Sequence, residues 1–184
     1  MALAEIVRRA EEAADTARKK YGVEIPVMDI CRLTEKIGGK VVASGGPNQV
    51  YAELQPDGDS FRIIIPDSYA LDQRNFLAAH CLGHLFLHCG YPEKRDWNNV
   101  PDHSGKEDRT KEAEANAFAE AFLMPEEKFS RVYETYLRDG VQTEEAAIRP
   151  ADRHFLAIRS TASYFKAERT EVIMRAVRMG YLQC

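Results

Sequence analysis

The segment that decides the fold of this chain is LDQRNFLAAHCLGHLFLH, residues 71–88. It is rich in leucine and phenylalanine and contains no proline, so it predicts a helix that is buried in the protein core. Asp67 and Ser68 precede it and offer side-chain oxygens that can cap its first turn. We expect the helix to end near Gly90, because glycine readily adopts the left-handed conformation found at helix ends.

Two histidines on this predicted helix indicate a metal site. His80 and His84 are four residues apart, which places them on one helix face with Cβ atoms about 5–6 Å apart. Both imidazoles can then reach one ion at Zn–N distances of about 2.0–2.1 Å. The spacing is that of the H-E-x-x-H zinc motif, except that Cys81 stands where that motif has the glutamate that activates the attacking water. The alternative is a pair of core histidines that neighbouring polar groups satisfy.

A third ligand is expected from the next predicted helix, residues 110–124, which is rich in alanine and ends before Pro125. We assign Glu112 as this ligand. Asn116 lies one turn further and would hold a ligand histidine by its outer nitrogen. Glu114 is the competing ligand, although it projects about 200° around the helix from Glu112. Alternatively, both glutamates belong to a solvated acidic first turn that the helix dipole favours.

Together, these two segments resemble the ImmA/IrrE family of metallopeptidases. The matching stretches are AAHCLGHLFLH, residues 78–88, and EAEANAFAEAFLMP, residues 112–125, of which the second is the more specific. The resemblance implies a zincin-like α+β fold and a gluzincin-like zinc site formed by His80, His84 and Glu112. It also implies a protein target, because members of this family cleave or inactivate helix-turn-helix transcriptional repressors.

Cys81 is the departure from this family, whose members carry the catalytic general base at this position. A thiol stops short of where a glutamate carboxylate would lie, and losing a general base typically costs about 10²–10⁴-fold in rate. We therefore expect a zinc endopeptidase scaffold with impaired catalysis. A second hypothesis is a non-catalytic pseudo-protease that sequesters a repressor or antitoxin. In a third, Cys81 is a thiol switch that binds zinc until it is oxidised, and the plainest alternative is a buried thiol that fills space.

The segments before the histidine helix predict a small antiparallel sheet that packs on this helix. Residues 41–43, 49–54 and 61–65 have the composition of strands, and a turn at residues 55–60 separates the last two. In zincin-like enzymes an edge strand beside the active-site helix holds the peptide substrate by strand addition. We expect one of these strands to do the same.

The predicted elements divide the chain into two parts. We expect a zincin-like metallopeptidase domain over residues 1–138 and a helical C-terminal region over residues 139–184. Within the first part, the ligand helices span about 70–89 and 110–124, and a polar loop at residues 91–109 connects them.

Composition limits the partners and the compartment. The chain has 184 residues, 45% of them hydrophobic, and a net charge of −4, which argues against direct nucleic-acid binding. No segment approaches the ~20 apolar residues of a membrane span, and the N-terminus lacks the apolar core of a signal peptide. Four cysteines without a C-x-x-C pair predict reduced thiols and a cytoplasmic protein. Among the other histidines, His88 is expected to have a structural role at the helix end, and His103 and His154 have no assigned role.

Overall fold

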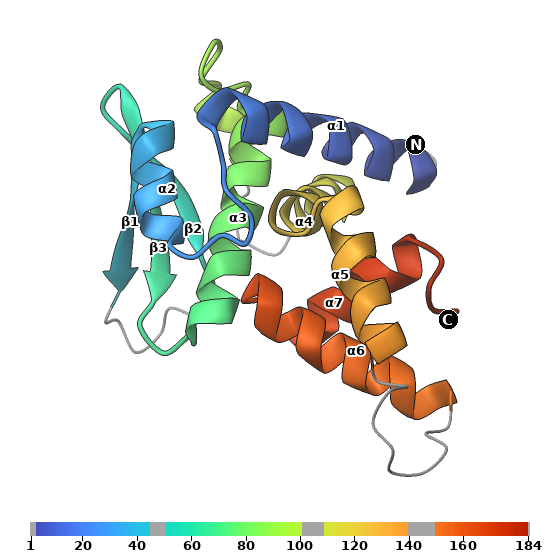
Figure 1. The fold of residues 1–184 in the computed structure, drawn as a ribbon. Helices are drawn as coiled ribbons and strands as arrows, with labels where there is room; N and C mark the ends of the chain where they lie inside the picture. Colours follow the sequence, from blue (N-terminus) through green and yellow to red (C-terminus); the bar gives the residue numbers. More distant parts are fainter. Residues whose placement is uncertain (1–2, 45–50, 101–108, 140–149, 184) are drawn as a thin grey trace.

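The computed structural model describes residues 3–44, 51–100, 109–139 and 150–183 (Figure 1). Parts of the predicted strand at 49–54, of the predicted loop with His103 and of the predicted C-terminal region lie outside these residues. In chain order, the elements are α1 (Leu3–Tyr21), α2 (Ile30–Ile37), β1 (Gly39–Ser44), β2 (Glu53–Asp57), β3 (Ser60–Pro66), α3 (Leu71–Leu87), the short 3₁₀ helix η1 (Trp97–Asn99), α4 (Arg109–Leu123), α5 (Glu126–Asp139), α6 (Pro150–Phe165) and α7 (Arg169–Arg178).

Helix α3 lies at the centre of the fold, between the sheet and α4 (Figure 1). Leu82 and Leu85 are fully buried, as the apolar composition of this segment predicts. The expected caps at Asp67 and Ser68 are wrong, because the backbone N–H of Asp67 still pairs with β1 through the carbonyl of Ser44. The helix instead begins after Ala70, whose backbone N–H donates to the Gln73 side chain at 3.0 Å.

The sheet has three strands in the order β1-β3-β2, and it is mixed rather than wholly antiparallel. The β2–β3 pair is the predicted antiparallel hairpin, whereas β1 pairs with β3 in parallel. The prediction was wrong for β1 because strand composition does not tell which neighbour a strand pairs with. The hairpin turn is also shorter than expected, since β2 extends to Asp57 and the chain reverses at Gly58, which has a φ of +61°. The α+β fold, with a small sheet packed on the histidine helix, is confirmed.

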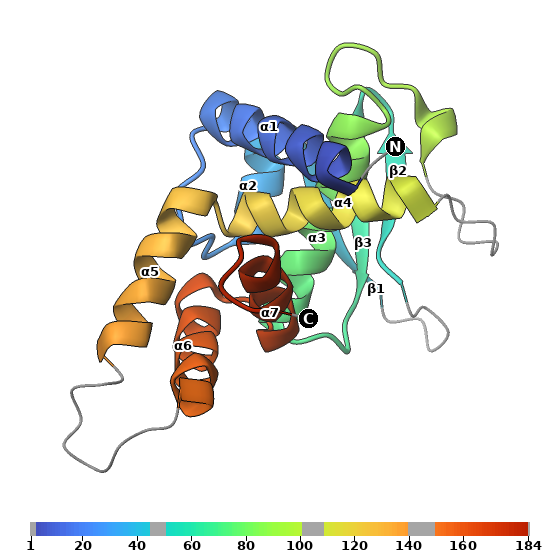
Figure 2. The ribbon, with the colours of Figure 1, turned by 90° about the vertical axis from the view of Figure 1, so that its right-hand side faces the viewer.

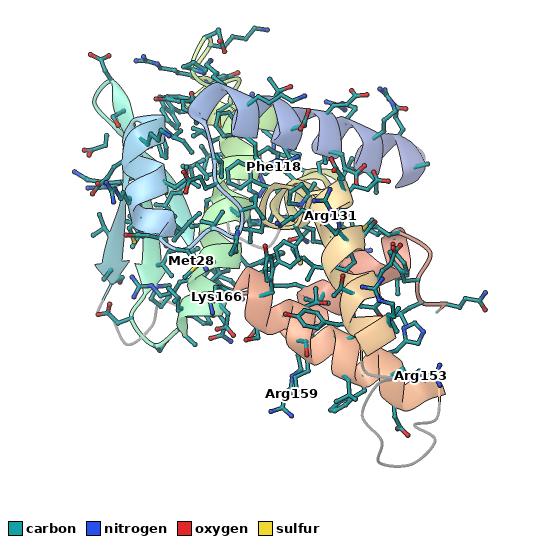
Figure 3. The ribbon with its side chains drawn as sticks, viewed as in Figure 1. Met28, Phe118, Arg131, Arg153, Arg159 and Lys166 are labelled. Carbon is teal, nitrogen blue, oxygen red and sulfur yellow. The ribbon has the colours of Figure 1, made fainter. Side chains whose placement is uncertain are left out.

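Helix α1 packs on α4 (Figure 2), and its Glu11 forms an ion pair with Arg175 of α7. The buried ring of Phe118 on α4 lies where α1, α3 and α4 meet, and it packs against Phe86 of α3 (Figure 3). This packing holds α1, α3 and α4 together as one unit.

The C-terminal helices α5, α6 and α7 pack on one another and return to α4 (Figure 1). The rings of Phe129 on α5 and Phe165 on α6 stack with their centroids 6.1 Å apart. Arg175 of α7 is 1% exposed and donates through Nε to the carbonyl of Met124 at the end of α4, at 3.1 Å. Within the described ranges, no helix combines the length and the apolar character that crossing a membrane requires.

Candidate metal centre

Three side chains from two helices converge at one point. His80 and His84 come from α3, and Glu112 comes from the first turn of α4. The two Nε2 atoms are 3.0 Å apart, and the carboxylate oxygens of Glu112 lie 3.3 Å from His80 Nε2 and 3.2 Å from His84 Nε2. Among the residues that the structure describes, this is the one group of His, Cys, Asp and Glu side chains whose ligand atoms converge closely enough to hold a metal ion.

Gly83 allows α3 and α4 to approach closely beside this group. A Cβ atom at Gly83 would lie 3.0 Å from both the Cα and the carbonyl oxygen of Ala115 on α4. Cβ atoms rarely lie this close to a neighbour, so a side chain at position 83 would require the two helices to shift apart by a few tenths of an ångström. Because His84 follows Gly83 and Ala115 lies one turn after Glu112, this close crossing brings the carboxylate to the imidazoles.

Both histidines are held by their outer nitrogens. His80 Nδ1 is 2.9 Å from the side-chain oxygen of Asn116, and His84 Nδ1 is 3.0 Å from His88 Nδ1. An amide oxygen can only accept, so His80 carries a proton on Nδ1 and its Nε2 presents a lone pair to Glu112 when the ring is neutral. The position predicted for Asn116 therefore agrees with the geometry.

The donor set fits a divalent cation. A lone pair of His80 that faces the Glu112 carboxylate at 3.3 Å is unfavourable unless a cation lies between them. A tetrahedral zinc ion places its ligand atoms about 3.3 Å apart, close to the separations of 3.0 to 3.3 Å at this site. Two imidazoles and one carboxylate also form the protein ligand set of one class of catalytic zinc sites, which leave a fourth position open.

The charges of these groups agree with such a role. Burial lowers the pKa of His84 to about 4, so its ring is neutral near neutral pH, as a metal ligand must be. The neighbouring imidazoles of His80 and His84 hold the pKa of the Glu112 carboxyl well below its usual range. With Glu112 ionised, the group presents a negative charge to a cation.

A comparison with protein families decides what this arrangement belongs to. The family model described as the IrrE N-terminal-like domain, peptidase family M78, matches residues 35–176. The chain belongs to this family. The predicted membership in the ImmA/IrrE metallopeptidases is thereby confirmed, and the chain contains a metallopeptidase-like domain.

Solved structures agree with the IrrE-like fold. A Mycobacterium tuberculosis transcriptional regulator matches 96% of the chain with a TM-score of 0.53 and 16% sequence identity. At this identity the likeness shows the fold alone, and the chain spans about half, 52%, of the length of that protein. A comparison with curated proteins found no match.

Cys81 follows His80 directly, where the H-E-x-x-H zinc motif has its glutamate. Its side chain is buried, with 3% of the residue exposed. Burial, followed by the negative charges of Glu112 and Glu53, raises the pKa of the Cys81 thiol to about 12. Without a metal, the thiol therefore stays protonated near neutral pH, and Cys81 is not among the residues whose ligand atoms converge. Glu53 begins the edge strand β2, so the sheet also contributes a charge to this site.

Two further residues beside the site were not predicted to act together. Glu114 does not compete with Glu112, because its carboxylate contacts His88 Nε2 at 3.0 Å and Arg9 Nη1 at 2.9 Å. Its side chain is 5% exposed, so it is not part of a solvated first turn. In the sequence, only the four-residue spacing between His84 and His88 indicated that His88 lies beside the site.

The remaining predicted histidines lie elsewhere. His154 is on α6, where its Nδ1 is 2.9 Å from the hydroxyl of Tyr133, far along the chain from the site. His103 lies outside the described residues.

Proposed function

We propose that this chain is a zinc-dependent endopeptidase-like protein that acts on a protein target, and that Cys81 impairs its catalysis. The observation that carries the proposal is the convergence of His80, His84 and Glu112, with the outer nitrogens of both histidines held by hydrogen-bond partners. Zinc, when bound, supplies a Lewis acid that polarises a carbonyl group and lowers the pKa of water.

The residues of the chain bind and orient the metal but provide no base at position 81. A general base must take a proton near neutral pH, and a thiol whose pKa is raised to about 12 is already protonated. The Glu112 carboxylate does not replace it, because Glu112 is expected to bind the metal. Peptide hydrolysis should therefore be slower by about 10²–10⁴-fold than with a glutamate at this position.

The expected target is a helix-turn-helix transcriptional repressor. This expectation rests on the resemblance to repressor-directed ImmA/IrrE proteins, and the M. tuberculosis protein of similar fold is itself a transcriptional regulator. The edge strand β2 is the candidate to hold an extended segment of the target, because its first residue lies close enough to Cys81 to affect the thiol. We propose a cytoplasmic location, which the free thiols Cys31, Cys81 and Cys89 support. No direct contact with nucleic acid is proposed.

The first test is zinc stoichiometry of the purified, reduced chain by elemental mass spectrometry. About one zinc per chain is expected, with loss of the metal in His84→Ala and retention in the control His154→Ala, whose histidine lies on α6. A wild-type chain without zinc after reconstitution would contradict the proposal.

The second test restores the missing base. The zinc-loaded Cys81→Glu variant should cut a helix-turn-helix repressor that the wild-type chain leaves intact. Cys81→Gln is the matched control, because it has the same length as glutamate but cannot take the proton. If Cys81→Glu binds zinc and cuts no more than Cys81→Gln, the endopeptidase proposal is wrong.

A pseudo-protease that sequesters a repressor or antitoxin is the alternative. The buried, protonated Cys81 favours it, because the three metal-binding residues are in place while position 81 offers no base. In this case the wild-type chain should bind its partner stably, and the partner should stay uncut after Cys81→Glu. Calorimetry with the intact repressor and gel analysis of the same mixture measure both properties.

A further inference from the structure

A series of polar contacts runs from the candidate metal centre to helix α1; it is buried as far as Glu114 and ends at Arg9, whose side chain is 42% exposed. His84 Nδ1 is 3.0 Å from His88 Nδ1, and His88 Nε2 is 3.0 Å from Glu114 Oε2. The other oxygen of this carboxylate, Oε1, is 2.9 Å from Arg9 Nη1. The side chains of His84, His88 and Glu114 are each 5% exposed or less.

We propose that His88, Glu114 and Arg9 are positioning residues that set the tautomer of His84, so that its Nε2 lone pair faces the metal. This inference rests on the zinc site proposed above and extends it to α1. Arg9 lies outside residues 35–176, the part of the chain that the family model matches.

The direction of each hydrogen bond follows from what the groups can donate. A carboxylate only accepts, so the proton of neutral His88 is on Nε2, where it donates to Glu114. His88 Nδ1 then has a lone pair and must accept from His84 Nδ1–H. With its single proton on Nδ1, neutral His84 leaves Nε2 free as a metal ligand.

Arg9 sets the direction of the hydrogen bonds in this series of contacts, called the relay below. A guanidinium group has only donors, so the group that faces it must accept. Glu114 accepts from Arg9 with Oε1 and from His88 with Oε2. The buried carboxylate in turn needs a positive partner, because an unpaired charge is costly to bury.

The two metal-binding histidines are therefore held in different ways. His80 has a single acceptor, Asn116, on the same helix as Glu112. His84 depends on three residues in series, the last of which belongs to α1. This difference predicts that changes on α1 reach the metal through His84 alone.

Glu114→Gln should reverse the relay while changing little in shape. Arg9 requires an acceptor, so the amide oxygen faces Arg9 and the NH₂ group faces His88. His88 Nε2 must then accept, its proton moves to Nδ1, and His84 carries its own proton on Nε2, towards the metal. Changing such an outer partner typically lowers metal affinity by about 10–100-fold.

The decisive test is a double substitution. The second substitution should restore the zinc affinity that the first one lowers, whereas a loss of packing would only lower it further. In the Glu114→Gln background, Arg9→Met should restore zinc affinity, because the amide can then rotate its oxygen towards His88. Arg8→Met is the matched control on the same helix, since Arg8 pairs with Glu5 and Glu12 on the exposed surface. It should leave the affinity of Glu114→Gln unchanged.

Two measurements on the full chain decide the outcome. Zinc Kd is measured by competition with a chromophoric chelator, after circular dichroism has shown that each variant is folded. The tautomer of His84 is read from its ¹⁵N shifts in the metal-free wild-type chain, where Nδ1 should carry the proton.

Loss of affinity in Glu114→Gln, its recovery with Arg9→Met and an Nδ1–H tautomer would support the relay. The relay is wrong if the metal-free wild type has His84 protonated on Nε2, or if the losses from Glu114→Gln and Arg9→Met simply add. A chain that binds no zinc but shows the Nδ1–H tautomer would refute the proposed zinc function and support the relay, so the two failures are distinct.

Discussion

Gly83→Ala tests whether the close crossing of α3 and α4 builds the metal centre. Within a helix, replacing glycine by alanine stabilises a protein by about 0.5–1 kcal/mol when nothing else changes. Here the new Cβ would lie 3.0 Å from the Cα and the carbonyl oxygen of Ala115, and 3.2 Å from the Cβ of Phe118. Both neighbours are fully buried, and the first contact is with backbone that cannot rotate away.

The expected net effect is a loss of stability. Forcing an extra carbon into a packed core typically costs about 1–3 kcal/mol, so after the helix gain the variant should lose about 1–2 kcal/mol. The two helices must also separate by about 0.5 Å to restore ordinary contact distances of ~3.5 Å. This separation moves Glu112 away from His80 and His84, and zinc affinity should fall with stability.

Urea unfolding with and without zinc measures both effects, and the sign of the first decides the argument. A variant that unfolds at a higher urea concentration than the wild type would show that helix propensity outweighs the contact. Zinc affinity equal to the wild type would separately refute the link between the helix crossing and the metal centre.

Two further predictions concern the core and the metal. Burial raises the pKa of Glu171 from 4.5 to about 8, so this carboxyl favours folding below about pH 4.5 and its contribution is lost as the pH rises through 8. Between pH 5 and pH 8, the free energy of unfolding should fall by about 3 kcal/mol less in Glu171→Gln than in the wild type. The same pH dependence of urea unfolding in both proteins would contradict this. Asn116→Ala should weaken zinc binding by about 10–100-fold in chelator competition. Asn116→Asp is the control, because it keeps an oxygen acceptor for His80 Nδ1. Equal zinc affinity of the alanine variant and the wild type would exclude this role for Asn116.

Local pattern was enough to predict the main helices. The helix over residues 71–87 was expected from its apolar composition, and the helix over residues 109–123 from its alanine content and the proline that follows it. The four-residue spacing of His80 and His84 also indicated a shared ligand face, because this spacing is a property of any helix. The same logic failed for β1, whose parallel pairing with β3 depends on the path of the chain between strands.

The division of the chain at residues 138 and 139 stays a prediction. The structure shows α7 returning to α4 through Arg175, so the C-terminal helices pack against the helix that carries Glu112. The family match also extends through most of these helices, to residue 176.

The sequence by itself determined the two ligand helices, the spacing of the histidines and the loss of a base at position 81, because each is a local property of neighbouring residues. The sequence also led us to assign Glu112 rather than Glu114 as the third ligand, but only the tertiary structure shows where each carboxylate lies and what Glu114 contacts. Glu112 and Glu114 lie two residues apart on one helix, so their side chains point in different directions. The close crossing at Gly83 turns Glu112 towards His80 and His84, and the packing of α1 along α4 gives the buried Glu114 its partner Arg9.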